Sequence, residues 1–284
     1  MKISSLAYHD VILENKHNDS GFKNSSAKSY KIDYDEFELQ INKINEAKKF
    51  IPVTINDLVE KNLPDCFMLT FDDGGVSAFT SIKDILDKYK WKGHFFITGK
   101  YINKKGFLST EQIIQLKNDG HIIGSHSWSH PLIISSLNDD ELNYEWKKSI
   151  DILEDILNEP IITASIPGGF FSNRVAKSVI NSGVKFLFTS EPVRRSYYIQ
   201  ECQIFGRFSV KKNFSNEQVI SLIKSSSLEQ YRQYIFWQYK KLGKTLLGKK
   251  YITFRRFYSN IKLINILIFV LNMFYTPHSL QFYV

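Results

Sequence analysis

Two neighbouring carboxylates, Asp72 and Asp73, end an apolar run and stand directly before a glycine pair, in the stretch LTFDDGG at residues 69–75. If this run is a strand of a parallel sheet, the carboxylates lie at the edge where α/β enzymes form their active sites. Adjacent side chains on a strand point to opposite faces, so the two carboxylates would take different roles. Taken alone, Asp-Asp-Gly is more often a turn whose aspartates cap a helix.

Two histidines four residues apart, His126 and His130, follow another short apolar run in the stretch GSHSWSHP at residues 124–131. Imidazoles at this spacing converge on one metal ion when the backbone between them makes a single turn, and a carboxylate completes such a set. Either Asp73 or Asp72 could supply that carboxylate. A lone histidine is more often an ordinary polar residue, but both motifs lie at strand ends of one pattern, which favours a shared metal site.

Short apolar runs alternate with amphipathic stretches from about residue 66 onward, which predicts strands and helices in turn. The expected strands are 66–71, 94–98, 121–124, 161–166 and 185–189, and the expected helices are 76–89, 109–120, 138–157 and 173–182. Outside this region we expect a strand at 4–9, a polar loop at 14–31, a helix at 33–50, a closing strand at 204–210 and a helix at 215–224. This alternation predicts an α/β fold with parallel strands, either an open doubly wound sheet or a (β/α) barrel.

Residues 4–224 resemble the polysaccharide deacetylase family, the NodB-like carbohydrate esterases of family four, whose Thr-Phe-Asp-Asp-Gly and His-Ser/Thr-x-x-His motifs are complete here. The resemblance implies an irregular (β/α) barrel that binds a divalent metal, usually Zn²⁺. It further implies that Asp72 is the catalytic base, and that Asp73, His126 and His130 are the metal ligands.

Two other motifs of that family are altered in this sequence. In SIPGG at residues 165–169, Ser165 takes the position of an arginine that steadies the catalytic aspartate, while the amide of Gly168 could still hold the oxyanion. Arg207 is a candidate substitute from a later strand, although an ordinary surface arginine is the favoured interpretation. The family's Leu-x-His has no match, so we expect His9, at the end of the opening strand, to donate the proton, to contact sugar or to anchor its loop.

The resemblance implies a metal-dependent hydrolase that removes N-acetyl groups from an N-acetylated glycan or glycan precursor, in cell-surface polysaccharide metabolism. One alternative is a weak or inactive protein of the same fold that binds glycan, as the altered motifs indicate. A second alternative is nucleic-acid binding through the final third of the chain, where basic pairs stand among aromatic residues. Because no nucleic-acid motif accompanies that charge, we do not expect a nucleic-acid partner.

Charge and composition divide the chain of 284 residues, which is long enough for a sizeable core. Residues 191–284 hold 15 Lys and Arg against four Asp and Glu, and after residue 225 the pattern has no clear period. We therefore expect a deacetylase-type domain at 1–227 and a basic, aromatic and apolar extension at 228–284. The apolar run 263–275 is short for a membrane span and predicts either a core helix or peripheral contact with the inner membrane face.

The cellular location is predicted from the two cysteines and the first residues. Two distant cysteines, Cys66 and Cys202, form no disulfide framework and are expected to be buried thiols. The first residues show no secretory signal, which predicts a cytoplasmic protein.

Overall fold

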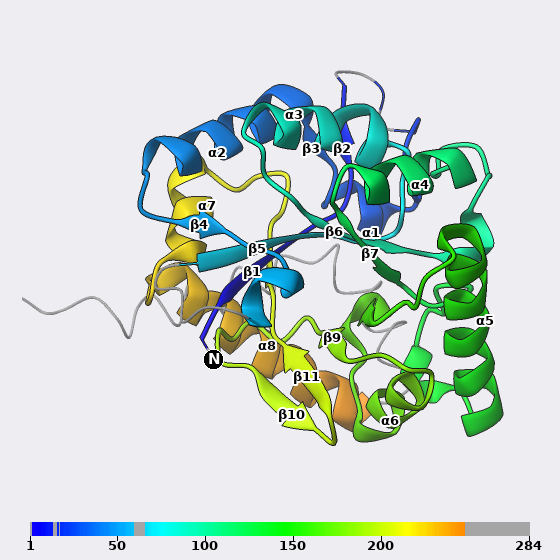
Figure 1. The fold of residues 1–284 in the computed structure, drawn as a ribbon. Coiled ribbons are helices and arrows are strands. Elements are labelled where there is room, and N and C mark those ends of the chain that lie inside the picture. Colours follow the sequence, from blue (N-terminus) through cyan, green and yellow to red (C-terminus); the bar gives the residue numbers. More distant parts are fainter. Residues whose placement is uncertain (1, 14–15, 17, 60–65, 248–284) are drawn as a thin grey trace, which may run out of the picture. The chain divides into compact units, whose positions relative to one another are not determined.

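A computed structural model describes residues 2–13, 16, 18–59 and 66–247 of the chain, and in it one large sheet dominates (Figure 1). Its strands follow the order β10-β11-β9-β8-β7-β6-β5-β1-β12, with β4 paired to β5. All pairs are parallel except β10 with β11. The strands are β1 Ser4–Tyr8, β4 Ile51–Pro52, β5 Cys66–Phe71, β6 His94–Ile97, β7 Ile122–Ser125, β8 Thr163–Ser165, β9 Phe186–Phe188, β10 Tyr197–Ile199, β11 Cys202–Phe205 and β12 Phe208–Ser209.

The sheet must curl, because two neighbouring segments of the chain pair near its opposite ends. Strand β11 pairs with β9 and strand β12 pairs with β1, yet only Gly206 and Arg207 separate them. The three residue steps from Phe205 to Phe208 span at most about 11 Å. The two ends of the sheet therefore meet around Gly206 and Arg207, which gives the irregular (β/α) barrel that the sequence predicts and excludes the open doubly wound sheet.

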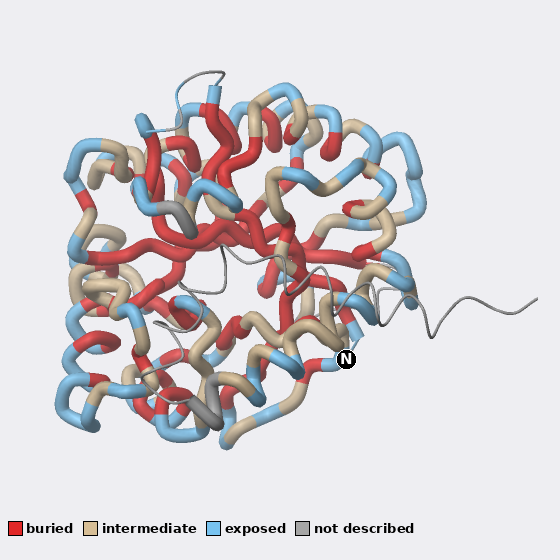
Figure 2. Tube along the Cα trace, turned by 180° about the vertical axis from the view of Figure 1, so that it is seen from behind, coloured by how far each residue is buried: buried red, intermediate tan, exposed pale blue. Residues whose placement is uncertain are grey.

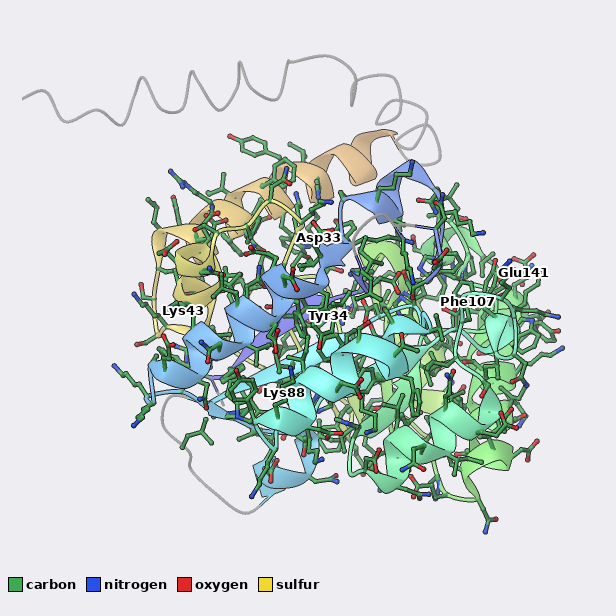
Figure 3. The ribbon with its side chains drawn as sticks, turned by 90° about the horizontal axis from the view of Figure 1, so that it is seen from above. Asp33, Tyr34, Lys43, Lys88, Phe107 and Glu141 are labelled. Carbon is green, nitrogen blue, oxygen red and sulfur yellow. The ribbon has the colours of Figure 1, made fainter. Side chains whose placement is uncertain are left out.

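Helices surround the sheet, as parallel strands require. They are α1 Ser25–Lys28, α2 Tyr34–Glu46, α3 Lys83–Lys88, α4 Thr110–Asn118, α5 Asp139–Leu157, α6 Asn173–Asn181, α7 Asn216–Ile223 and α8 Leu228–Leu247. A π-helical turn, η2 Ala78–Ile82, leads into α3, and short 3₁₀ turns are η1 Ile55–Val59, η3 Gly99–Tyr101, η4 Ile134–Ser136 and η5 Pro167–Gly169. Helices α2 and α3 run side by side (Figure 3), where the Lys88 ammonium pairs with Glu38.

Local capping explains where the helices begin. The Ser109 hydroxyl accepts a hydrogen bond from the amide of Gln112, and the Gln112 side chain accepts one from the Ser109 amide, so a capping box begins α4. Asn138 with Glu141 and Ser215 with Gln218 make the same reciprocal pairs before α5 and α7.

One expectation about the last third of the chain is wrong. The single strand predicted at 204–210 is broken between β11 and β12 at Gly206, where the backbone carbonyls of Glu191 and Val193 lie so close that a Cβ would meet them at 2.3 and 2.6 Å. Within the stretch after residue 225, Leu228–Leu247 form the helix α8, which includes the boundary between the units Met1–Trp237 and Gln238–Val284. The apolar run 263–275 lies outside the described residues, and the domain division at residue 227 stays a prediction.

The sheet and the inner faces of the helices form the core (Figure 2). A second, smaller core cluster contains Phe96, Phe188 and Phe205, in which the ring of Phe188 stacks on Phe205 and is tilted against Phe96. Cys66 and Cys202 are buried free thiols, as expected. Among the described residues no helix combines the length and the apolar character needed to cross a bilayer.

Candidate metal and catalytic site

Asp73, His126 and His130 come together at the carboxyl end of the sheet. Asp73 follows β5, and the two histidines follow β7. Oδ1 of Asp73 lies 3.5 Å from Nε2 of each histidine, and one donor atom from each residue lies within 4.8 Å of the others. Two ligands bound about 2.1 Å from a tetrahedral ion are about 3.4 Å apart, so this donor set fits Zn²⁺ or a similar divalent cation. The residue pattern alone allowed either Asp72 or Asp73 as the carboxylate ligand, and Asp73 is the one that lies nearer to the imidazoles.

The loop between the histidines is a tight turn that hydrogen bonds to a side chain of α5 hold in place. Glu145 on α5 accepts hydrogen bonds from the amide of Ser129 at 2.8 Å and from its hydroxyl at 2.6 Å. Ser127 and His130 have φ of 64° and 55°, a left-handed conformation that non-glycine residues adopt only when contacts hold them there. This turn makes the two imidazoles converge, as the four-residue spacing predicts.

The ring of His126 is held in the state that a metal requires. Its Nδ1–H donates a hydrogen bond to the carbonyl oxygen of Ser165 at 2.9 Å. Nε2 is then unprotonated, and its lone pair is available on the side of Asp73. Burial lowers the pKa of His126 to about 3, and burial also lowers that of His130. Both rings are therefore neutral near pH 7, which is the form that binds a cation.

The two adjacent carboxylates have opposite electrostatic environments. Burial raises the pKa of Asp73 to about 7, and the neighbouring charge of Asp72 acts in the same direction. Burial also acts to raise the pKa of Asp72, but the charge of Arg207 outweighs it and holds that pKa well below its usual range. Asp72 is therefore ionised at neutral pH, whereas Asp73 is only partly ionised there, and a nearby cation would favour its charged form.

Arg207 is buried, with 1% of its surface exposed, so the interpretation as a surface arginine is wrong. Its Nη1 and Nη2 donate to the two carboxylate oxygens of Asp72 at 2.7 and 2.8 Å. The remaining donors reach the hydroxyl of Thr70, the hydroxyl of Ser165 and the carbonyl of Thr189. The whole guanidinium is thus satisfied inside the barrel, which is what a buried charge needs.

Ser165, which stands where the family motif has an arginine, contacts Arg207 directly. The hydroxyl of Ser165 lies 2.7 Å from Nη2 of Arg207, so the guanidinium stands beside the position where the family's arginine would begin. A signal for this role exists in the sequence, since Arg207 interrupts the apolar run IFGRF at 204–208 and a charge in such a run is buried only when it is paired.

His9 lies next to the two carboxylates. In the parallel pairing of β1 with β5, Tyr8 stands opposite Phe71, and the Asp72 amide donates to the Tyr8 carbonyl at 3.0 Å, so His9 and Asp72 leave the sheet side by side. The His9 ring stacks on Tyr30 with centroids 4.6 Å apart. Its Nδ1 is buried and has no hydrogen-bond partner within the described part of the chain.

Gly168 lies in η5, directly after β8 and three residues beyond Ser165. It is exposed and has a φ of 59°, which glycine adopts without strain. The structure thus places it at the same edge of the sheet as the metal donors, on the strand beside β7.

Residues 60–187 match the family model described as polysaccharide deacetylase. This segment contains the metal donors, Asp72 and Gly168, whereas His9 and Arg207 lie outside it. The chain is 31% identical over 128 residues to an uncharacterized 30.6 kDa protein of Geobacillus stearothermophilus and 30% identical over 153 residues to the peptidoglycan-N-acetylmuramic acid deacetylase PdaA of Bacillus subtilis. These matches cover 43% and 48% of this chain, and the chain spans about half the length of these relatives, 45% and 54%.

The fold is also that of solved deacetylases. The Streptococcus pyogenes deacetylase PplD, in complex with acetate, superposes with a TM-score of 0.67 and 20% sequence identity, covering 79% of this chain and 99% of its own. At this identity the likeness concerns the fold, and it confirms the deacetylase-type (β/α) barrel.

Proposed function

Because residues 60–187 belong to the polysaccharide deacetylase family, we propose that this protein is a metal-dependent hydrolase that removes N-acetyl groups from an N-acetylated glycan or glycan precursor in cell-surface polysaccharide metabolism. Asp73, His126 and His130 would hold the metal, and Zn²⁺ is the ion we expect. The observation that carries the proposal is the position of Asp72, which lies 4.0 Å from Nε2 of His126 and accepts hydrogen bonds from the buried Arg207 at both carboxylate oxygens.

A bound divalent metal would polarise the acetyl carbonyl and make the attacking water more acidic. Asp72 takes the proton of that water. The hydrogen bonds from Arg207 keep the Asp72 carboxylate ionised and hold its orientation, which is the state that can accept a proton. The amide of Gly168 would donate to the acetyl oxygen as negative charge develops there.

Acetate release from N-acetylglucosamine oligomers tests this function. We expect turnover with Zn²⁺, loss of turnover after chelation, and recovery when metal is returned. A protein that binds Zn²⁺ and the oligomers but releases no acetate would support the alternative, a glycan-binding protein of the same fold. Comparing polymeric with lipid-linked substrates would then identify the physiological class.

His9 is our candidate for the general acid that protonates the departing sugar amine. It is the histidine that the fold brings beside Asp72 without engaging it in the metal donor set. We expect His9→Ala to lower kcat by about 10²-fold with full metal content, since one positioned acid contributes about that much. An unchanged kcat across the pH profile would return His9 to a structural role on Tyr30.

For the basic final third we propose a membrane contact rather than a nucleic-acid site, because no nucleic-acid motif accompanies its charge. Part of its charge is used inside the protein, since Arg207 pairs with Asp72 and Arg194 donates to Ser4 and to the Ser225 carbonyl. We expect a cytoplasmic protein attached peripherally to the inner membrane face through the extension 228–284, close to a lipid-linked glycan precursor.

Vesicle binding tests this attachment. Anionic vesicles should bind the full chain at low salt, and binding should weaken with salt and vanish when residues 248–284 are deleted. This truncation retains α8, where Gln233 hydrogen-bonds both backbone groups of Ser209 and so supports the barrel. A full chain that ignores anionic vesicles at low salt contradicts the attachment.

A further inference from the structure

An aromatic side chain from a loop distant in sequence packs against one of the metal donors. The ring of Phe22 lies 5.0 Å from the ring of His130, centroid to centroid. On its other sides Phe22 meets Tyr101 at 4.9 Å and Phe107 at 5.2 Å, both edge to face. Phe107 is labelled in Figure 3. Phe22 is therefore wedged between two fixed rings and the imidazole.

The loop that carries Phe22 is tied down by a buried polar cluster, which we call the Asp10 cluster: Asp10, Ser20, Lys31 and Ser77. Oδ1 of Asp10 accepts hydrogen bonds from the hydroxyls of Ser20 and Ser77 at 2.5 and 2.9 Å, and Oδ2 lies 3.9 Å from the Lys31 ammonium. Lys31 also donates to the Ser20 carbonyl, and the Ser77 amide donates to the Ser20 hydroxyl. All four residues are at most 3% exposed.

Glycines let this cluster approach the loop that carries the metal carboxylate. A Cβ at Gly21 or at Gly75 would lie 2.0 Å from a carboxylate oxygen of Asp10, so neither position accepts a side chain. The carbonyl of Gly106 accepts hydrogen bonds from the amides of both Gly21 and Val76. The backbone on the N-terminal side of Phe22 is thus joined directly to the segment that follows Asp73.

The two histidine donors are therefore oriented by different means. A hydrogen bond from Nδ1 to the Ser165 carbonyl fixes the ring of His126. The ring of His130 is more accessible, with 26% of its side chain exposed, and it packs against Phe22. Groups that orient a metal ligand change metal affinity by about 10- to 100-fold when they are removed.

We propose that Phe22, held in place by the Asp10 cluster, is a positioning residue that orients His130 for the metal. Without the Phe22 ring, the His130 side chain could rotate and move its Nε2 away from Asp73. Metal binding would then be weaker, because it would have to order the imidazole. The inference rests on the proposed function only in assuming that these three donors bind a divalent cation.

The full metal-free chain provides the test, with Zn²⁺ affinity measured by competition against a chromophoric chelator and no substrate present. Phe22→Leu, which keeps an apolar side chain but removes the ring, should weaken Zn²⁺ binding about tenfold. Phe22→Tyr should stay within about twofold of the parent, because it keeps the ring. Phe79→Leu, the same change at another half-buried phenylalanine on η2, is the matched control and should leave the affinity unchanged.

Weakening the hydrogen bonds of the Asp10 cluster should also reduce the affinity for Zn²⁺. Ser20→Ala removes the hydroxyl that bridges Asp10 and the Ser77 amide, and it should weaken Zn²⁺ binding by a smaller factor than Phe22→Leu. The absorption spectrum of the Co²⁺-substituted protein should change in Phe22→Leu and not in Phe79→Leu, since it reports the geometry of the donors.

The outcomes separate this inference from the proposed function. Parent-like Zn²⁺ affinity in Phe22→Leu, or an equal loss in Phe79→Leu, overturns the positioning role even if the parent releases acetate. Tenfold weaker binding in Phe22→Leu supports the positioning role even if the parent proves inactive on every glycan tested.

Discussion

Replacing Asp72 with asparagine is expected to lower kcat by about 10²- to 10⁴-fold while the protein keeps a full complement of metal. Asparagine preserves the shape of the side chain and one acceptor for Arg207, but it cannot take a proton from water. The three metal donors are separate residues, so their geometry is retained. Elemental analysis and acetate release, measured on the same preparation, provide the comparison.

The matched controls are the alanine variants of Asp73, His126 and His130. Each removes one donor of the set, so each should lose metal and, with it, turnover. Stoichiometric zinc in both histidine variants would refute the assignment of the metal site. Metal loss in Asp72→Asn would instead show that Asp72 belongs to the donor set.

Arg207→Met should be the most destabilising single change at this site, costing about 3–5 kcal/mol of unfolding free energy. Methionine fills similar space but leaves Asp72 as a buried, unpaired carboxylate. The folded-state pKa of Asp72 is depressed, so the stability that Arg207 contributes is present above about pH 4 and is lost in stronger acid. Denaturant unfolding at pH 7 measures this contribution.

The pH dependence of activity should also change in Arg207→Met. Without Arg207 the pKa of Asp72 rises, so the acidic limb of the kcat/KM profile should move to higher pH in Arg207→Met. The double variant Ser165→Arg with Arg207→Met should move that limb back, because position 165 adjoins the vacated space. An acidic limb at the same pH in parent and Arg207→Met would contradict this role of Arg207.

The proximity of the three candidate metal donors could be predicted from sequence because the pattern that brings them together is local. Asp72 and Asp73 stand at one strand end, and His126 and His130 within one turn, so residue type and spacing carry the information. Each of these segments also lies where the alternation of strands and helices expects it.

The partners of these residues are not specified by a local pattern, because they come from distant segments, and the sequence makes Arg207 only a candidate from a later strand. Arg207 is 135 residues from Asp72, and its position depends on a strand break that periodicity does not reveal. Phe22 belongs to a stretch predicted only as a polar loop, and its contact with His130 depends on how Asp10 ties that loop to the residues after Asp73.

The joint between β11 and β12 has a consequence for the order in which the protein becomes competent during synthesis. A nascent chain that has emerged as far as β9 already contains both candidate metal-binding motifs. Arg207, which neutralises Asp72, follows about 20 residues later. It reaches its place only when β12 pairs with β1, the first strand of the chain. Contacts of such sequence separation form slowly. Competence for the proposed catalysis should therefore lag behind competence for metal binding, and fraying of the β12 edge should remove Arg207 from Asp72 while the candidate metal donors are still folded.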